Sequence, residues 1–190
     1  RVQFWHPVVM SVADALSYVE NAPDGDADVE RFREQMCTFV QSHPDALHRT
    51  CLDGHFTASA LIVHADGARV LLMHHTKLQR WLQPGGHVDG DGDLASAALR
   101  EAWEETGMKG LFIEQSPIDL DVHRIPARGE EPEHDHLDVR FLVRAPQGAK
   151  ISANHESTDM QWFGFEEVAD LGLDTGLHRM LRAGQARLAT

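Results

Sequence analysis

The chain has 190 residues, 42% hydrophobic and 25% charged, which is enough for one domain with an appendage around a buried core. A formal net charge of -13 argues against nonspecific binding to nucleic-acid backbones or anionic membranes. No stretch approaches the roughly 18 apolar residues of a membrane-spanning helix. Only two cysteines, Cys37 and Cys51, are present, without a disulfide-framework pattern, so we expect a cytoplasmic location.

Residues 1–50 are predicted to form an N-terminal helical extension ahead of a second domain at residues 51–190. Apolar residues recur at helical spacing in residues 8–19 and 28–40. Asn-Ala-Pro-Asp-Gly at 21–25 separates the two helices as a turn. The ordinary interpretation of this hairpin is a packing or dimerisation element, which leaves a homodimer open. A lid over a substrate is the alternative.

Histidines and cysteines are frequent around the end of this extension. A zinc site could be imagined from Cys37, His43, His48, Cys51 and His55. Their spacing matches none of the usual structural zinc patterns. Solvent-facing histidines and a buried cysteine are therefore the preferred interpretation.

Two strands and a helix follow. Residues 56–64 and 68–75 have strand character and are joined by a turn at Asp66 and Gly67. A Pro-Gly-Gly turn at 84–86 then leads into a helix at 94–106. Asp93 is the expected N-cap of this helix, and Gly107 its left-handed C-terminal residue.

The rest of the chain predicts further strands, a charged loop and a closing helix. The strands are expected at residues 111–125, 137–144 and 160–163, the loop at 128–138, a helical turn at 165–168 and the last helix at 173–188. Strands on both sides of one central helix, with a second helix at the end, indicate an α+β or αβα layered domain.

The helix at 94–106 concentrates carboxylates on one face. Glu101, Glu104 and Glu105 fall within an arc of about 100° on a helical wheel, while the opposite face is apolar. A solvated helix face would explain the glutamates alone. The glycine turn in front of them favours metal binding, because glycine lets the backbone approach a metal or a phosphate closely. Carboxylate oxygens suit Mg²⁺ or Mn²⁺ better than zinc.

The stretch from Gly86 to Met108 resembles the signature of the Nudix hydrolases. That signature is Gly, five residues, Glu, seven residues, Arg-Glu, an aliphatic residue, any residue, Glu-Glu, any residue, Gly and an aliphatic residue. The fixed positions met in this sequence are Gly86, Arg100, Glu101, Glu104, Glu105 and Gly107. The early glutamate is replaced by Gly92. In the family that glutamate mostly supports the loop and the helix, so its loss bears on loop rigidity more than on chemistry.

The resemblance implies a Nudix-type αβα sandwich with a mixed β-sheet. It also implies divalent-metal-dependent hydrolysis of a phosphoanhydride bond in a nucleoside diphosphate derivative, a small phosphorylated molecule, with water attacking phosphorus. Glu101, Glu104 and Glu105 would bind Mg²⁺ or Mn²⁺, together with the carbonyl group of Gly86. The place of Arg100 in the motif is structural.

Other site residues are less specific. Glu105 and Glu156 are the candidates for the general base. Arg140 could contact a phosphate from a strand. Three further side chains could contact the substrate or stack on a base, although chance exposure or core packing explains them equally well: His87, His136 and Trp81.

Three competing functions fit the sequence less well. A non-catalytic Nudix-like nucleotide-binding or regulatory module would have no need for all three glutamates. A DNA-binding regulator conflicts with the negative charge. An isoprenoid diphosphate isomerase on the same scaffold would need additional cysteine and glutamate chemistry around the motif, which is missing here.

Overall fold

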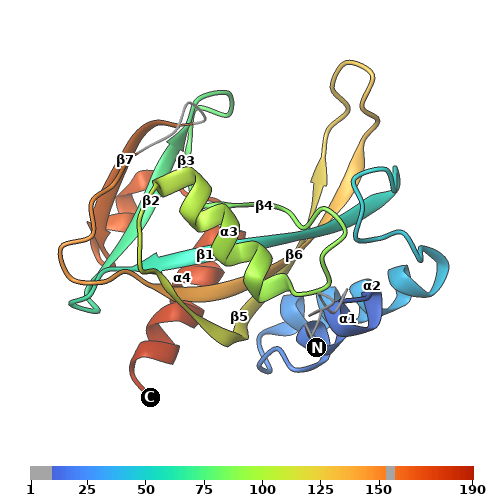
Figure 1. Ribbon diagram of the computed structural model, residues 1–190, viewed down its shortest axis with the longest axis horizontal. Helices are drawn as coiled ribbons and strands as arrows, with labels where there is room; N and C mark the ends of the chain where they lie inside the picture. Colours follow the sequence, from blue (N-terminus) through green and yellow to red (C-terminus); the bar gives the residue numbers. More distant parts are fainter. Residues whose placement is uncertain (1–9, 153–156) are drawn as a thin grey trace, which may run out of the picture.

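The computed structural model describes residues 10–152 and 157–190, and this part of the chain forms a mixed β-sheet between helices (Figure 1). The helices are α1 (Val12–Glu20), α2 (Ala27–Ser42), α3 (Leu94–Thr106), the short 3₁₀ helix η1 (Glu167–Leu171) and α4 (Thr175–Leu188). The strands are β1 (Gly54–Val63), β2 (Arg69–His75), β3 (Trp81–Leu82), β4 (Gly85–His87), β5 (Phe112–Ile125), β6 (His134–Arg144) and β7 (Ser157–Gly164). The α+β prediction is confirmed.

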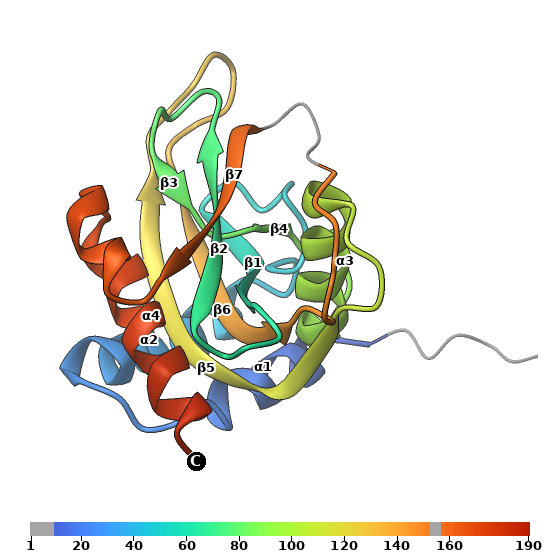
Figure 2. The same ribbon diagram turned by 90° about the vertical axis from the view of Figure 1, so that its left-hand side faces the viewer.

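The sheet has the order β3-β2-β1-β6-β5, with β4 paired to β1 and β7 paired to β2. β1 and β6 run parallel along their length, whereas the other pairs are antiparallel. Helix α3 lies on one side of the sheet and α4 on the other (Figure 2). This arrangement makes the domain a three-layered αβα sandwich, as expected.

Local sequence signals set both ends of α3. The Asp93 side chain accepts a hydrogen bond from the Ser96 amide at 3.0 Å, which satisfies one of the free amides of the first turn. Gly107 ends the helix with φ of 63°, a left-handed conformation that glycine adopts without strain. The predicted bounds and both terminal residues of this helix are confirmed.

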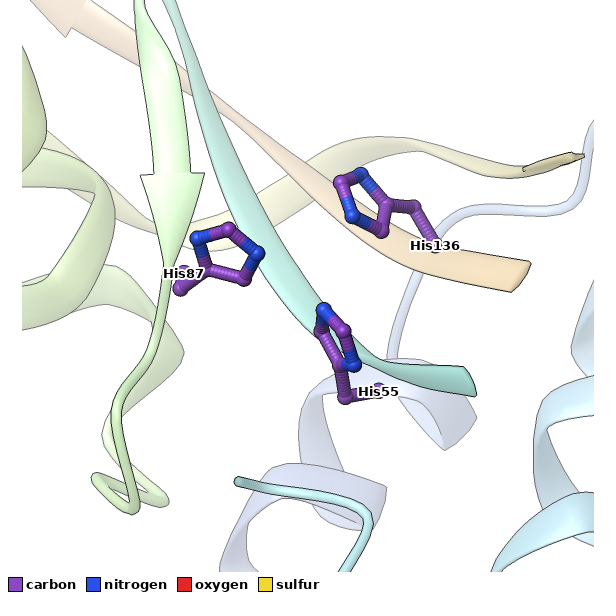
Figure 3. A group of neighbouring side chains, drawn as sticks. All are labelled: His55, His87 and His136. Carbon is purple, nitrogen blue, oxygen red and sulfur yellow. The ribbon is translucent and has the colours of Figure 1, made fainter. Parts of the chain in front are cut away.

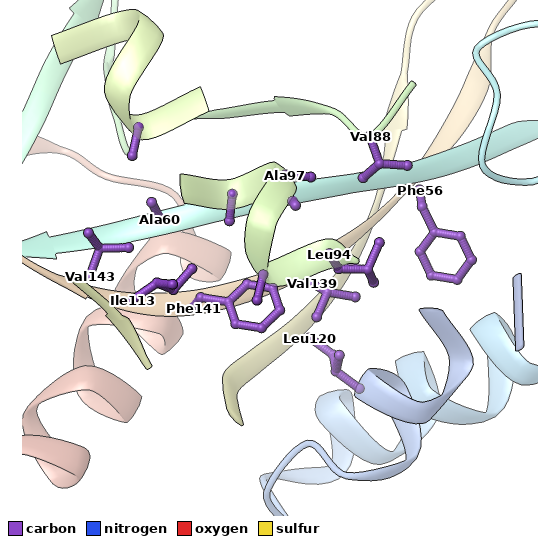
Figure 4. Packing of buried hydrophobic residues seen from close by; sticks show 14 of the residues in the cluster. Phe56, Ala60, Val88, Leu94, Ala97, Ile113, Leu120, Val139, Phe141 and Val143 are labelled. Carbon is purple, nitrogen blue, oxygen red and sulfur yellow. The ribbon is translucent and has the colours of Figure 1, made fainter. Parts of the chain in front are cut away.

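The sheet has a hydrophobic cluster on each face. The larger one combines the apolar side of α3 with β1, β5 and β6, and residues of α1 and α2 belong to it (Figure 4). The smaller one packs α4 and η1 against the other face through residues such as Leu61, Leu142 and Leu177. Side chains alternate between the faces of a strand, so odd-numbered residues of β1 and even-numbered residues of β6 point toward the α4 side.

The N-terminal helices are part of the main core. Buried Ala15 and Val19 of α1, and Val29, Phe32 and Met36 of α2, belong to the same cluster as the sheet. These contacts favour a packing role for the extension. No helix in the described part of the chain is both long and apolar enough to cross a membrane.

Two local predictions were wrong. The glycine stretch at residues 85–87 is a short strand, β4, antiparallel to β1, because neighbouring β1 offers it backbone partners. The segment expected to be a charged loop at residues 128–138 ends early, since β6 begins at His134. His134 and His136 therefore lie on a strand.

Candidate active site

The glutamate face of α3 lies against the glycines of β4. The Gly85 amide donates a hydrogen bond to Glu105 Oε2 at 3.0 Å. A Cβ atom on Gly86 would lie 2.5 Å from Glu101 Oε2, so only a glycine lets this carboxylate approach the strand. The structure thus brings together the predicted residues Gly86, Glu101 and Glu105.

Arg100 joins the helix to β4. Its Nη1 atom lies 2.5 Å from Glu101 Oε1 and 3.7 Å from Glu104 Oε1, and its Nη2 atom donates to the carbonyl oxygen of His87 at 2.8 Å. One guanidinium group therefore holds two glutamates and the strand in a fixed relation. These contacts agree with a structural role for Arg100.

The three glutamates differ in burial. Glu105 is buried, the Glu101 side chain is 15% exposed, and that of Glu104 is 48% exposed. Burial raises the pKa of Glu101 despite the opposing effect of Arg100. A nearby cation would stabilise the charged form of a buried carboxylate. Carboxylate oxygens are also the donors that Mg²⁺ and Mn²⁺ prefer. The donor set fits a hard divalent cation.

His87 and His136 lie together with His55, which was not predicted as a site residue (Figure 3). One ring nitrogen of each histidine lies within 4.8 Å of those of the other two. His55 is 2% exposed, which corrects the expectation that it faces solvent. The position of His55 follows from the parallel pairing of β1 with β6, which places it opposite His136. No local sequence signal predicts that pairing.

Arg140, expected from the sequence to contact a phosphate, is instead surrounded by protein groups. It is 3% exposed and lies on the α4 side of the sheet, within a buried group of charges. Its guanidinium group contacts three carboxylates at 2.8–3.0 Å and the Gly176 carbonyl oxygen at 2.8 Å; the carboxylates are those of Asp119, Asp121 and Asp138. These contacts occupy the guanidinium nitrogens, so Arg140 is a structural cation.

Two predicted residues remain: Trp81, which packs against the smaller hydrophobic cluster, and Glu156, which is not among the described residues. Trp81 is partly buried beside Phe163, with ring centroids 4.9 Å apart, and packs against the smaller cluster. Core packing therefore accounts for Trp81 as observed. Glu156 lies outside the described residues, so its role as a base stays a prediction.

The comparisons with known proteins agree with this fold. The family model described as NUDIX domain matches residues 54–183. Phosphatase NudJ of Escherichia coli (strain K12) is 45% identical over 112 residues, which cover 57% of this chain and 68% of that protein.

Solved structures show the same fold. An Ap4A hydrolase of C. elegans, crystallised as a binary complex, superposes with a TM-score of 0.58 at 23% identity, covering 70% of this chain and 97% of that one. A Nudix hydrolase of M. Smegmatis, RenU, has a TM-score of 0.50 at 25% identity, with 71% and 83% covered. The chain belongs to the Nudix family and is a Nudix hydrolase.

Proposed function

We propose that this enzyme hydrolyses a phosphoanhydride bond in a nucleoside diphosphate derivative, with Mg²⁺ or Mn²⁺ as cofactor. The observation that carries the proposal is the contact between the α3 glutamates and the glycines of β4. Glu101, Glu104, Glu105 and the carbonyl group of Gly86 would hold the cation. When bound, such a cation acts as a Lewis acid on phosphate oxygens and lowers the pKa of water.

The protein itself must position the carboxylates and accept a proton from the attacking water. Arg100 keeps Glu101 and Glu104 next to β4 through the contacts described above. Glu105 and Glu156 are the two proposed bases. A base needs only to reach its proton within hydrogen-bond distance, so an unusual pKa is not required.

A substrate panel tests the proposed activity. Purified protein is assayed with ADP-ribose, dinucleoside polyphosphates, NADH and nucleoside triphosphates, each with Mg²⁺, Mn²⁺ or EDTA. We expect cleavage of at least one compound that depends on the added cation. Hydrolysis that continues unchanged in EDTA would refute the metal dependence, and a lack of phosphoanhydride cleavage under all conditions would refute the activity.

Variants test the assigned residues. Glu104→Gln combined with Glu105→Gln should abolish the metal-dependent rate, whereas Glu34→Gln on the exposed side of α2 is the matched control. Separate Glu105→Gln and Glu156→Gln variants distinguish the two bases. Glu156→Gln should lose rate without a change in the cation concentration that gives half-maximal activity, if Glu156 is the base. Glu105→Gln should raise that concentration in either case, because Glu105 is also a proposed metal ligand, and an undiminished rate in Glu156→Gln would leave Glu105 as the base.

A homodimer and a cytoplasmic location also stay predictions from the sequence. Size-exclusion chromatography coupled to light scattering tests the first directly.

A further inference from the structure

Three strands contribute one histidine each to a compact group of ring nitrogens. His55 comes from β1, His136 from parallel β6 and His87 from β4, and the imidazole rings face one another (Figure 3). Each contributes a nitrogen within 4.8 Å of the other two. Tetrahedral zinc with Zn–N bonds of about 2.1 Å places its nitrogens about 3.4 Å apart, a spacing that modest ring rotations would reach from this arrangement.

His55 presents an unpaired nitrogen to this group. Its Nδ1 atom lies 3.3 Å from the carbonyl oxygen of Cys51. A carbonyl oxygen only accepts hydrogen bonds, so Nδ1 carries the proton and Nε2 of the neutral ring carries a lone pair. Nε2 is buried and has no hydrogen-bond partner among the described residues. Buried polar atoms without a partner are rare in folded proteins and need an explanation.

The hydrogen bond from His55 to a carbonyl is itself informative. Histidines that bind metals usually donate their other ring N–H to a backbone carbonyl or a carboxylate, which fixes the tautomer and the ring orientation. His55 already has this arrangement without a metal. An ion at the centre of the group would give its Nε2 the missing partner.

A fourth histidine borders the group. The carbonyl oxygen of Pro132 lies 2.9 Å from His134 Nδ1 and accepts a hydrogen bond from it. The Nε2 atom of His134 lies 3.3 Å from His136 Nε2. His134 is thus placed to orient His136.

We propose that His55, His87 and His136 form a second metal site, for one transition-metal ion of the Zn²⁺ class, separate from the carboxylate site on α3. Imidazole nitrogens suit Zn²⁺, whereas Mg²⁺ prefers oxygen donors. Three protein ligands leave a coordination position for an external ligand. His134 is a positioning residue for this site.

The second site adjoins the first through β4. The side chain of His87 belongs to the histidine group, while its carbonyl oxygen accepts from Arg100, which also contacts Glu101. Neighbouring residues on a strand point to opposite faces, so β4 separates the histidines from the carboxylates. An ion bound to the histidines would fix β4 and thereby the wall of the carboxylate site.

Binding measurements on the full chain test the proposal. Protein stripped with a chelator is titrated with Zn²⁺ by calorimetry in excess Mg²⁺, and with Co²⁺ by absorption spectroscopy. We expect one equivalent of each ion to bind, the visible absorption of Co²⁺ in a nitrogen-rich site of low coordination number, and a rise in Tm. If the wild-type protein binds neither Zn²⁺ nor Co²⁺, the proposal is wrong, regardless of the results with the variants.

Variants locate the ion. His134→Gln should weaken Zn²⁺ binding about 10- to 100-fold, and His55→Gln, His87→Gln or His136→Gln should weaken it further. His178→Gln on α4 is the matched control and should bind as the wild type does. Circular dichroism identifies any variant that does not fold. The Co²⁺ spectrum of the wild-type protein tests the nitrogen-rich site even if a variant fails to fold.

The two metal sites are distinguished with one more variant. Glu104→Gln combined with Glu105→Gln should retain the Zn²⁺ affinity of the wild-type protein. Loss of Zn²⁺ binding in that variant, together with undiminished binding in His55→Gln, would place the ion on the glutamates and refute the histidine site. The outcome is independent of whether any phosphoanhydride is cleaved.

Discussion

Gly92 lies directly against the main chain of Ser11. A Cβ atom on residue 92 would be 2.8 Å from the Ser11 amide nitrogen and would also overlap the Ser11 carbonyl oxygen. Gly92 occupies the early glutamate position of the Nudix signature, and the segment that leads into α1 fills the space where that side chain would begin. The glycine at this position therefore allows the N-terminal extension to pack against the loop before α3.

Restoring the family residue should harm this protein. Gly92→Glu forces the backbone at Ser11 away, so we expect a loss of at least about 1–3 kcal/mol of stability, typical of overpacking. Thermal and urea unfolding measure it. Gln115→Glu, which adds the same charge at an exposed position of β5, is the control. A Gly92→Glu protein as stable as the wild type would show that residues 10–11 do not pack here.

Gly86→Ala should impair catalysis more than folding. The added methyl group would lie 2.5 Å from Glu101 Oε2, so the carboxylate must move away from β4 while Arg100 holds it. Displacing a catalytic group by about 1 Å can cost about 100-fold in rate, and we expect a loss of that order in kcat/KM. Gly164→Ala, where the new atom would lie 3.3 Å from Glu167 Oε2, is the control for stability and activity. Equal kcat/KM values for both variants would contradict the assigned contact.

Arg140→Gln should destabilise the fold strongly. It would leave the buried carboxylates of Asp119 and Asp138 with fewer partners, and breaking a buried ion pair typically costs about 3–5 kcal/mol. Arg144 lies on the same strand as Arg140 and makes a more exposed ion pair with Glu114 of β5, so Arg144→Gln should lower the stability by only about 0–1 kcal/mol. Chemical denaturation of both variants tests this. Similar losses would mean that the charge group is not buried in solution.

The start of α3 is coupled to α1 through Asp93. The Tyr18 hydroxyl donates to Asp93 Oδ1 at 2.8 Å, while the same carboxylate caps the helix at Ser96. Asp93→Ala should lower the free energy of unfolding by about 0.5–2 kcal/mol because the helix loses its N-cap, and by a further amount because the contact with Tyr18 is lost. A double-mutant cycle with Tyr18→Phe should give a coupling energy of about 0.5–3 kcal/mol. Strict additivity would show that the two residues do not interact.

Local sequence signals determined α3, the helix that carries the proposed metal ligands. The bounds of α3, its Asp93 cap and the glycine that ends it depend on backbone groups within four residues, so spacing along the chain was enough to predict them. The same holds for the arc of glutamates, because helical geometry fixes which side chains share a face.

Contacts between distant segments were decided by the tertiary structure alone. Parallel pairing of β1 with β6 places His55 opposite His136, and antiparallel pairing of β5 with β6 places the Asp119 and Asp121 carboxylates around Arg140. The contact of Gly92 with the main chain of Ser11 likewise joins segments that are distant in the sequence. Such pairings depend on how the whole chain buries its apolar faces, which no short stretch of sequence encodes, and they fix where the histidines and the buried charges lie.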